Sequence, residues 1–202
     1  MSMLDLYTIA IFLIMYLICS INPAIEICKR KTGEDIRKLG SGNAGTANAM
    51  RVLGTPLGIL VIILDEVKVF VSFFIMLLIS KLFGNSVDTT FKTIFILASI
   101  IGHCFPIYYG FRGGKGVIVG ITTVAIFDPT NAVICIIAGL LVLLFTRTVS
   151  MGTLAGSILH LIISFVNRYD YIVAVLIAEA IVMFKHRSSI YRILTKQEQK
   201  FK

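Results

Sequence analysis

Seven long apolar stretches, separated by short polar segments, constrain this chain more than any other feature of its sequence. They run approximately over residues 3–27, 53–83, 91–109, 116–128, 131–146, 150–166 and 171–184. A helix that spans the ~30 Å hydrocarbon core of a bilayer needs about 20 mostly apolar residues, so the shorter stretches must be tilted or end inside the protein. With a mean hydropathy of +0.91 and only 15% charged residues, the chain lacks the polar surface that a soluble globule needs. The sequence predicts an all-α integral membrane protein with about seven transmembrane helices.

No internal repeat of fixed period and no low-complexity linker divides the chain. Residues 1–202 are therefore expected to form a single polytopic membrane domain.

The distribution of basic residues sets the expected orientation. Seven crossings place the two termini on opposite sides, and the loops at 28–51, 110–115 and 147–149 then share one side with the tail from Lys185. That side holds 15 of the 19 Lys and Arg residues, and by the positive-inside rule it is the cytoplasm. We expect the N-terminus outside and the C-terminus in the cytoplasm. The net charge of +8 then reflects topology, and we predict no nucleic-acid partner.

Two local features of the helices can also be predicted. The stretch 53–83 is long enough to contain a break, which we place near Asp65, Glu66 and Lys68. The tail 189–202 has apolar residues at helical spacing, which predicts a short amphipathic helix on the cytoplasmic surface.

The first polar loop, GSGNAGTANAMRVLG over residues 40–54, is typical of an anion site. Its glycine spacing matches the dinucleotide fingerprint, but no strand precedes it and no βαβ unit can be built, which argues against that reading. Glycines allow several N–H groups to point at one spot, and Ser41 and Asn43 can cap the following helix. The guanidinium of Arg51 suits a phosphate because it binds two oxygens at once. An ordinary capped turn is the alternative for this loop taken alone.

The second loop, GHCFPIYYGFRGGKGV over residues 102–117, contains a basic glycine turn. It is not a Walker A sequence, because Tyr109 stands where the first glycine belongs and Gly116 where Ser or Thr would hold magnesium. The remaining turn around Lys115, flanked by Arg112, predicts a second cradle for negative charge. His103, close to the same membrane boundary, is a candidate proton acceptor or hydrogen-bond donor, with a structural role as the alternative.

The third polar stretch begins where the last span ends. It contains His186, Arg187, Ser189 and the downstream carboxylate of Glu198. Basic residues are expected there from topology alone, but their combination with a histidine, hydroxyls and a carboxylate is more unusual.

Two ionisable residues lie within spans. His160 is expected to form an interhelical hydrogen bond. Glu179 is expected to be functional by default, although the sequence names no partner for it.

Together the three loops resemble the bacterial acyl-phosphate:glycerol-3-phosphate acyltransferase family (PlsY), from about Ser20 to the C-terminus. The family's motifs are similar to Gly40-Ser41-Gly42-Asn43-x-Gly45 … Asn48-x-x-Arg51, to Gly102-His103-x-Phe105-Pro106 … Arg112-Gly113-Gly114-Lys115-Gly116-Val117, and to His186-Arg187 … Ile190-x-Arg192 … Glu198.

The chain also departs from the family pattern at several positions. Thr46-Ala47 stands where the family has Ala-Thr, and Ile118-Val119 replaces another Ala-Thr pair. Ser189 takes the place of an asparagine, and Lys196 that of a glycine.

The resemblance implies transfer of a fatty acyl group from acyl phosphate to the 1-hydroxyl of glycerol 3-phosphate, which gives lysophosphatidic acid. It implies catalytic roles for Ser41, His103, Ser189 and Glu198. For phosphate and substrate binding it implies Gly42, Asn43, Gly45, Asn48, Arg51, Arg112, Gly113, Gly114, Lys115, Gly116, His186 and Arg187. His103 is the leading candidate for activating the hydroxyl, and a substrate phosphate oxygen is the alternative.

The resemblance also implies a place and a set of partners. The expected substrates are acyl phosphate and glycerol 3-phosphate, in a bacterial cell membrane, with the active site on the cytoplasmic face. Membrane lipid and a functional link to the enzyme that supplies acyl phosphate are expected as well. We predict no cofactor and no metal, because no His or carboxylate cluster has ligand spacing.

Two alternatives stay open at this point. A divergent paralogue that binds acyl phosphate or a phospholipid headgroup as a sensor would retain the phosphate-binding residues with altered motifs. An anion transporter would also use glycine-rich helix ends, but the basic loops all lie on one face.

Overall fold

The computed structural model describes residues 3–84, 86–198 and 200. They form nine α-helices and two short 3₁₀ turns, in this order: α1 (Met3–Cys19), α2 (Pro23–Thr32), η1 (Ile36–Lys38), α3 (Thr46–Leu53), α4 (Thr55–Leu82), α5 (Thr89–Cys104), η2 (Ile107–Tyr109), α6 (Val117–Phe127), α7 (Pro129–Thr146), α8 (Val149–Val166) and α9 (Ile172–Leu194).

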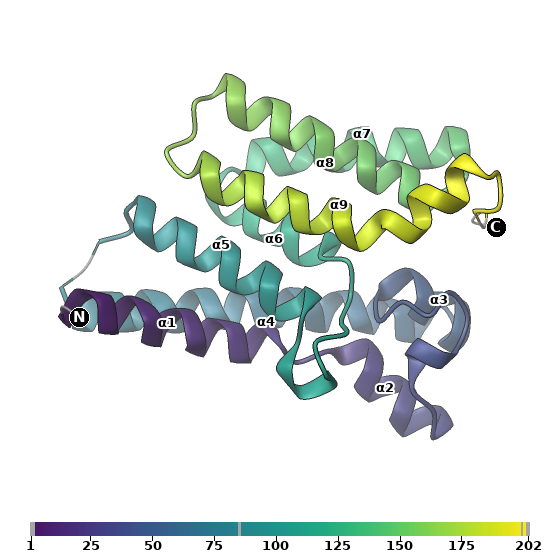
Figure 1. Cartoon of the computed structure of the whole chain (residues 1–202), viewed down its shortest axis with the longest axis horizontal. Helices are drawn as coiled ribbons and strands as arrows, with labels where there is room; N and C mark the ends of the chain where they lie inside the picture. The colour runs from purple at the N-terminus through teal and green to yellow at the C-terminus, as the bar shows by residue number, and fades with distance from the viewer. Residues whose placement is uncertain (1–2, 85, 199, 201–202) are drawn as a thin grey trace.

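The helices form two groups that lie along the long axis of the molecule (Figure 1). One group contains α1, α4 and α5, and the other contains α6 to α9. Helix α5 packs against both α1 and α9 and so joins the groups. The short helices α2 and α3 lie at the end of the molecule where α9 finishes, opposite the start of α1.

The main core lies where the two groups meet. Met15, Val69, Phe95, Val119 and Val175 come from α1, α4, α5, α6 and α9, and each is almost completely buried. A second, smaller core under α2, η1 and α3 supports the first polar loop. Many large apolar side chains face outward instead, with Phe145 87% exposed. Such a surface suits lipid better than water.

Among the described residues, four helical segments are long and apolar enough to cross a membrane: Leu6–Thr32, Thr89–Tyr109, Pro129–Thr146 and Val149–Val166. The first of them is interrupted between α1 and α2. There the side chain of Asn22 accepts a hydrogen bond from the Ile25 N–H and caps α2, while Pro23 occupies the first helical position.

Two predictions, one of a break within a helix and one of a separate tail helix, are wrong. Helix α4 runs unbroken over Thr55–Leu82, because Asp65 and Lys68 bond to each other and to α5 rather than interrupting the helix. The tail does not start a separate helix at Ser189. Helix α9 continues to Leu194, and the chain then turns back, with the N–H of Glu198 donating to the carbonyl oxygen of Arg192.

Candidate active site

The first polar loop is held in shape by Asn48. Its Oδ1 accepts from the Ser41 N–H at 2.8 Å, and its Nδ2 donates to the carbonyl oxygens of Ile36 and Leu39. The prediction that Ser41 and Asn43 cap α3 is wrong. The N-cap is Gly45, and no side-chain capping hydrogen bond forms there among the described residues. The amide of Asn48 is therefore engaged in the loop, and its predicted contact with phosphate stays a prediction.

Thr46 is the first residue of α3, and sequence reasoning did not select it. Its hydroxyl is buried and has no hydrogen-bond partner among the described residues. It lines the same cavity as Ser41 and Arg51. The shift from Ala-Thr to Thr-Ala therefore places a threonine in the wall of this cavity, with its hydroxyl buried.

The glycines of the second loop allow close packing against the end of α5. A Cβ on Gly114 would collide with the imidazole of His103, and one on Gly113 would collide with the His103 carbonyl oxygen. The N–H of Gly113 donates to Cys104 O and that of Gly114 to His103 O. These two amides are therefore not free to bind phosphate, which corrects the roles predicted for Gly113 and Gly114. The phosphate contact predicted for Lys115 and Gly116 stays a prediction.

His103 belongs to a buried cluster that the sequence did not predict. Its Nδ1 lies 3.0 Å from the Nζ of Lys68, and Lys68 Nζ lies 2.7 Å from Asp65 Oδ1. Nδ1 also lies 3.3 Å from Asp65 Oδ1, but the ammonium group of Lys68 is nearer and only donates hydrogen bonds. With Nδ1 accepting from Lys68, the proton of the neutral ring is assigned to Nε2. This assignment gives His103 an N–H group on the side of the ring that faces Gly114.

His186 has the opposite tautomer. Its Nδ1 lies 2.8 Å from the carbonyl oxygen of Val182, which only accepts. The ring proton is then on Nδ1, and Nε2 of the neutral ring is an acceptor. Because both histidines line one cavity, it offers a donor from His103 and an acceptor from His186.

A chain of hydrogen bonds joins the second loop to the third. The Nζ of Lys115 donates to Ser189 Oγ at 2.6 Å, and Arg192 donates to the same oxygen and, at 2.5 Å, to Glu198. Ser150, at the start of α8, donates to the other carboxylate oxygen of Glu198. Burial acts to raise the pKa of Glu198, but the hydrogen bonds from Arg192 and Ser150 prevail and hold it below its usual value.

The turn after α9 explains one departure in the third loop. Lys196 has φ 56°, in the left-handed region, where the family has glycine. A non-glycine residue pays a steric cost of about 1–2 kcal/mol in this conformation. The turn nevertheless forms and brings Glu198 back to Arg192.

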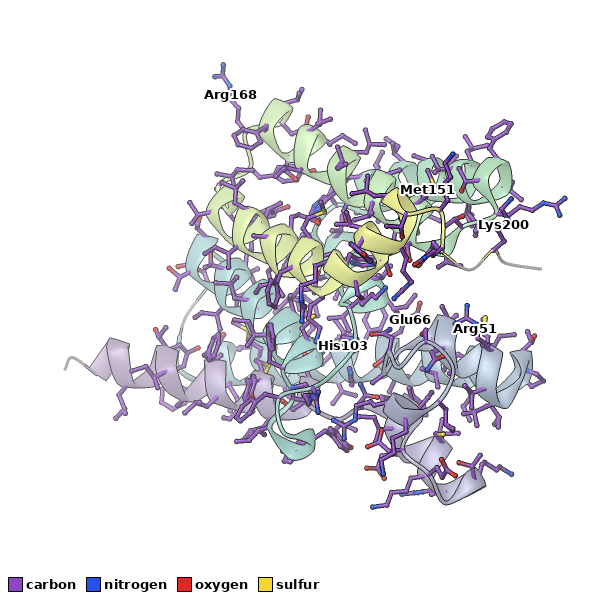
Figure 2. All side chains as sticks on the ribbon, turned by 45° about the vertical axis from the view of Figure 1, so that its right-hand side comes forward. Arg51, Glu66, His103, Met151, Arg168 and Lys200 are labelled. Carbon is purple, nitrogen blue, oxygen red and sulfur yellow. The ribbon has the colours of Figure 1, made fainter. Side chains whose placement is uncertain are left out.

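These groups meet in one cavity of about 630 Å³. Ser41, Arg51, His103, Lys115 and His186 all line it, so all three polar loops contribute. Figure 2 shows Arg51 toward the same end of the molecule as Lys200, away from Arg168, with His103 deeper between the two helix groups. Residues as distant in the sequence as Ser41 and His186, which are 145 positions apart, thus enclose a single polar site.

A second cavity of about 530 Å³ adjoins the first. Both are lined by Ser41, Asn43, Lys115 and Arg192. The second adds further basic side chains, namely Arg37, Lys38, Arg112, Lys185 and Arg187. Lys115 therefore stands between two positively charged spaces.

The family model of the glycerol-3-phosphate acyltransferases matches residues 9–196 of this sequence. The chain belongs to this family. A glycerol-3-phosphate acyltransferase from Aquifex aeolicus is 35% identical over 196 residues, which covers 95% of this chain and 99% of the relative. One from Listeria monocytogenes is 35% identical over 195 residues and covers 96% of both.

Solved structures agree with this acyltransferase assignment. The crystal structure of PlsY (YgiH), an integral membrane glycerol 3-phosphate acyltransferase, in its glycerol 3-phosphate form is similar with a TM-score of 0.86 at 33% identity, covering 96% of each chain. Its lysophosphatidic acid form gives a TM-score of 0.82 at 31% identity, covering 96% of this chain and 95% of the other.

Not every residue predicted for the acyltransferase site lines the larger cavity. Arg112 and Arg187 line the second one, and Arg187 lies over the ring of Phe184. Ser189 is fully buried behind Lys115 and lines neither of these two cavities. This placement indicates that Ser189 positions Lys115, whereas Glu198 reaches the larger cavity.

Other residues in this region had weak signals in the sequence. Asp65 and Lys68 were visible as charges inside an apolar helix, but their pairing with His103 depends on how α4 packs against α5. Arg192 lies in the third motif, and Ser150 had no local signal. Among the described residues, no group of three His, Cys, Asp or Glu side chains is placed to hold a metal ion.

The charge of Lys115 should control the pH dependence of the acyltransferase. Burial in the cavity wall lowers its pKa to about 8, helped by the nearby charges of Arg192 and Arg51 and opposed by Glu198. Only the ammonium form attracts phosphate, so kcat/KM should be level below that pKa and fall by about tenfold per pH unit well above it.

The control is Lys115→Arg, whose guanidinium stays charged throughout this range. Its kcat/KM, although lower, should not show the alkaline decline. The same decline in both proteins would show that another group is responsible.

Proposed function

We propose that this protein transfers a fatty acyl group from acyl phosphate to the 1-hydroxyl of glycerol 3-phosphate and releases lysophosphatidic acid and phosphate. The observation that carries the proposal is the shared cavity, in which Arg51, Lys115, His103 and His186 come together from three loops. The names of the relatives and of the PlsY structures, which include a glycerol 3-phosphate form and a lysophosphatidic acid form, support the same reaction.

The chemistry needs positioning and charge stabilisation rather than a covalent enzyme intermediate. The substrate hydroxyl oxygen attacks the acyl carbonyl carbon, the bond from that carbon to the phosphate oxygen breaks, and phosphate leaves with the electron pair. His103 donates from Nε2 to the negative charge that develops. Two acceptors are available for the hydroxyl proton, namely His186 Nε2 and an oxygen of the substrate phosphate.

Two phosphate groups are accommodated by the two adjoining cavities. Arg51, Ser41 and Thr46 bind one phosphate on the side of the first loop. Lys115, which lines both cavities, lies close to both substrates and offsets the charge expelled with phosphate. Holding the substrate hydroxyl close to the acyl carbonyl carbon, in the orientation needed for attack, supplies the rest of the rate enhancement.

The site lies at the cytoplasmic face of a bacterial cell membrane. We place seven crossings in the chain, with α1 and α2 as one interrupted crossing and α4 to α9 as the others. The N-terminus is then outside and the C-terminus in the cytoplasm. The basic loops support this orientation, and residues 1–202 act as one domain.

The donor substrate suggests a partner. Acyl phosphate is a reactive mixed anhydride, so the enzyme that makes it must release it close to this membrane surface. A functional link between the two enzymes follows from that chemistry.

The direct test uses the purified full-length protein in detergent with palmitoyl phosphate and labelled glycerol 3-phosphate. Labelled lysophosphatidic acid should form, and palmitoyl-CoA should not replace palmitoyl phosphate. Binding of both substrates without product would contradict the proposal and indicate a sensor. Anion flux in liposomes without acyl transfer would indicate a transporter.

Ser189 offers a prediction within the proposed site. Its hydroxyl accepts from Lys115 and Arg192, and an asparagine side chain reaches further and adds a donor. Ser189→Asn should raise kcat above that of the unmodified protein. Ser189→Ala should lower kcat/KM by about tenfold, because it removes a hydrogen bond to a charged group. Steady-state kinetics of both variants check this, and unchanged rates in both would exclude a role for this position.

A further inference from the structure

An apolar cavity extends the active site into the membrane part of the protein. It has a volume of about 180 Å³ and lies between α6, α7 and α8, with part of α9. Gly116, Val117, Leu140, Leu143, Val149 and Thr153 line both this cavity and the larger polar cavity. We call it the acyl groove, because a chain attached to a phosphate in the polar cavity has a continuous apolar path into it.

The acyl groove ends at a polar pair. His160 on α8 and Glu179 on α9 form an interhelical hydrogen bond of 2.8 Å between Nδ1 and Oε1, which confirms the prediction for His160 and supplies the partner that the sequence did not name for Glu179. Their side chains are only 12% and 15% exposed. Glu179 Oε2 is buried and has no hydrogen-bond partner among the described residues.

The pair also separates the acyl groove from a second apolar space. A small cavity of about 30 Å³ lies on its other side, lined by His160, Glu179 and apolar residues that include Phe127 and Val175. His160 and Glu179 line both cavities, together with Gly120, Val124 and Val182, so the pair supplies the polar part of the wall between them.

The position of this wall limits the length of an acyl chain. Ser150 lines the polar cavity and His160 the end of the groove, and ten residues of α8 span about 15 Å. This is shorter than an extended palmitoyl chain. A chain end pushed against the pair meets two polar side chains, which is unfavourable for methylene groups.

We propose that the His160–Glu179 pair sets the acyl-chain preference by closing the far end of the groove. The inference rests on the proposed acyl transfer and adds a specificity-determining pair to it. Long chains are disfavoured because they cannot pass the pair, and shorter ones leave part of the groove unfilled.

The test measures kcat/KM for a series of saturated acyl phosphates, from dodecanoyl to eicosanoyl, in the full-length protein. The double variant His160→Ala with Glu179→Ala removes both polar partners together, so that neither is left unpaired in the bundle, and it opens the far end of the groove. Its optimum should move to longer chains. The preference between two chains that differ by two methylenes should change by about tenfold if both become buried. The KM for glycerol 3-phosphate should not change.

A second variant keeps the test decisive if the double variant does not fold. Ser157 lines the acyl groove but not the small cavity, and it lies one helical turn before His160 on α8. Ser157→Leu should fill the groove before the pair and move the optimum to shorter chains. Ile162→Val, on the exposed face of α8, is the matched control and should leave the optimum in place.

The outcomes separate this inference from the proposed function. An active protein whose chain-length profile is the same in both groove variants would overturn the role of the pair. A protein that transfers none of the acyl chains would instead contradict the acyl transfer itself.

Discussion

Lys115→Ala is expected to lower kcat/KM by about 10- to 150-fold. Lys115 lines both polar cavities and donates to Ser189, which places its ammonium group beside both proposed phosphate positions. A hydrogen bond to a charged group is worth about 1.5–3 kcal/mol, which corresponds to that range. The measurement is acyl transfer from palmitoyl phosphate at limiting substrate. The loss should be larger if a substrate phosphate is left without a cation.

The matched control is Lys29→Ala, which removes an exposed lysine from α2, away from both cavities. It should leave kcat/KM unchanged. Equal losses of kcat/KM in the two variants would mean that Lys115 acts only through the net positive charge of the protein. Full activity of Lys115→Ala would show that no phosphate binds at this part of the cavity.

His103→Ala is expected to lower kcat by about 10²- to 10³-fold, the usual effect of losing one donor to a developing negative charge. The reason is the tautomer fixed by Lys68, which leaves an N–H on Nε2. His103→Gln should retain more activity than His103→Ala, because its amide is also a donor but cannot accept a proton as an imidazole base does.

A comparison of the two variants separates the two roles of His103. Equal, near-complete losses of kcat in His103→Ala and His103→Gln would indicate that His103 accepts the proton. Lys68→Met supplies a second readout, because it frees the tautomer without touching the cavity. It should lower kcat and introduce a dependence on histidine ionisation into the pH profile, whereas a purely structural Lys68 would leave the shape of that profile unchanged.

The sequence predicted the helical membrane architecture and the polar loops because both depend on local patterns. Apolar stretches separated by loops report helices directly, and Arg51 and Lys115 were recognisable from their glycine-rich surroundings. Both line the larger polar cavity, and their binding of phosphate stays a prediction. Motif order and spacing identified the family for the same reason.

The parts that sequence reasoning did not reach depend on packing between distant segments. Asp65 and Lys68 suggested a helix break, because a charge in an apolar stretch does not reveal a partner 35 residues further along the chain. Glycine spacing alone does not distinguish close packing from an anion cradle, and Gly113 and Gly114 serve the former. The return of Glu198 to Arg192 depends on a turn at Lys196 that has no glycine.

The most direct test of the account is a crystal structure of this protein with glycerol 3-phosphate and a non-transferable acyl phosphonate bound together. We expect both phosphorus groups in the adjoining cavities, with Arg51 and Lys115 within hydrogen-bonding distance of them and the acyl chain in the groove that ends at His160. Phosphorus groups bound elsewhere on the protein, with Arg51 and Lys115 contacting neither, would contradict it.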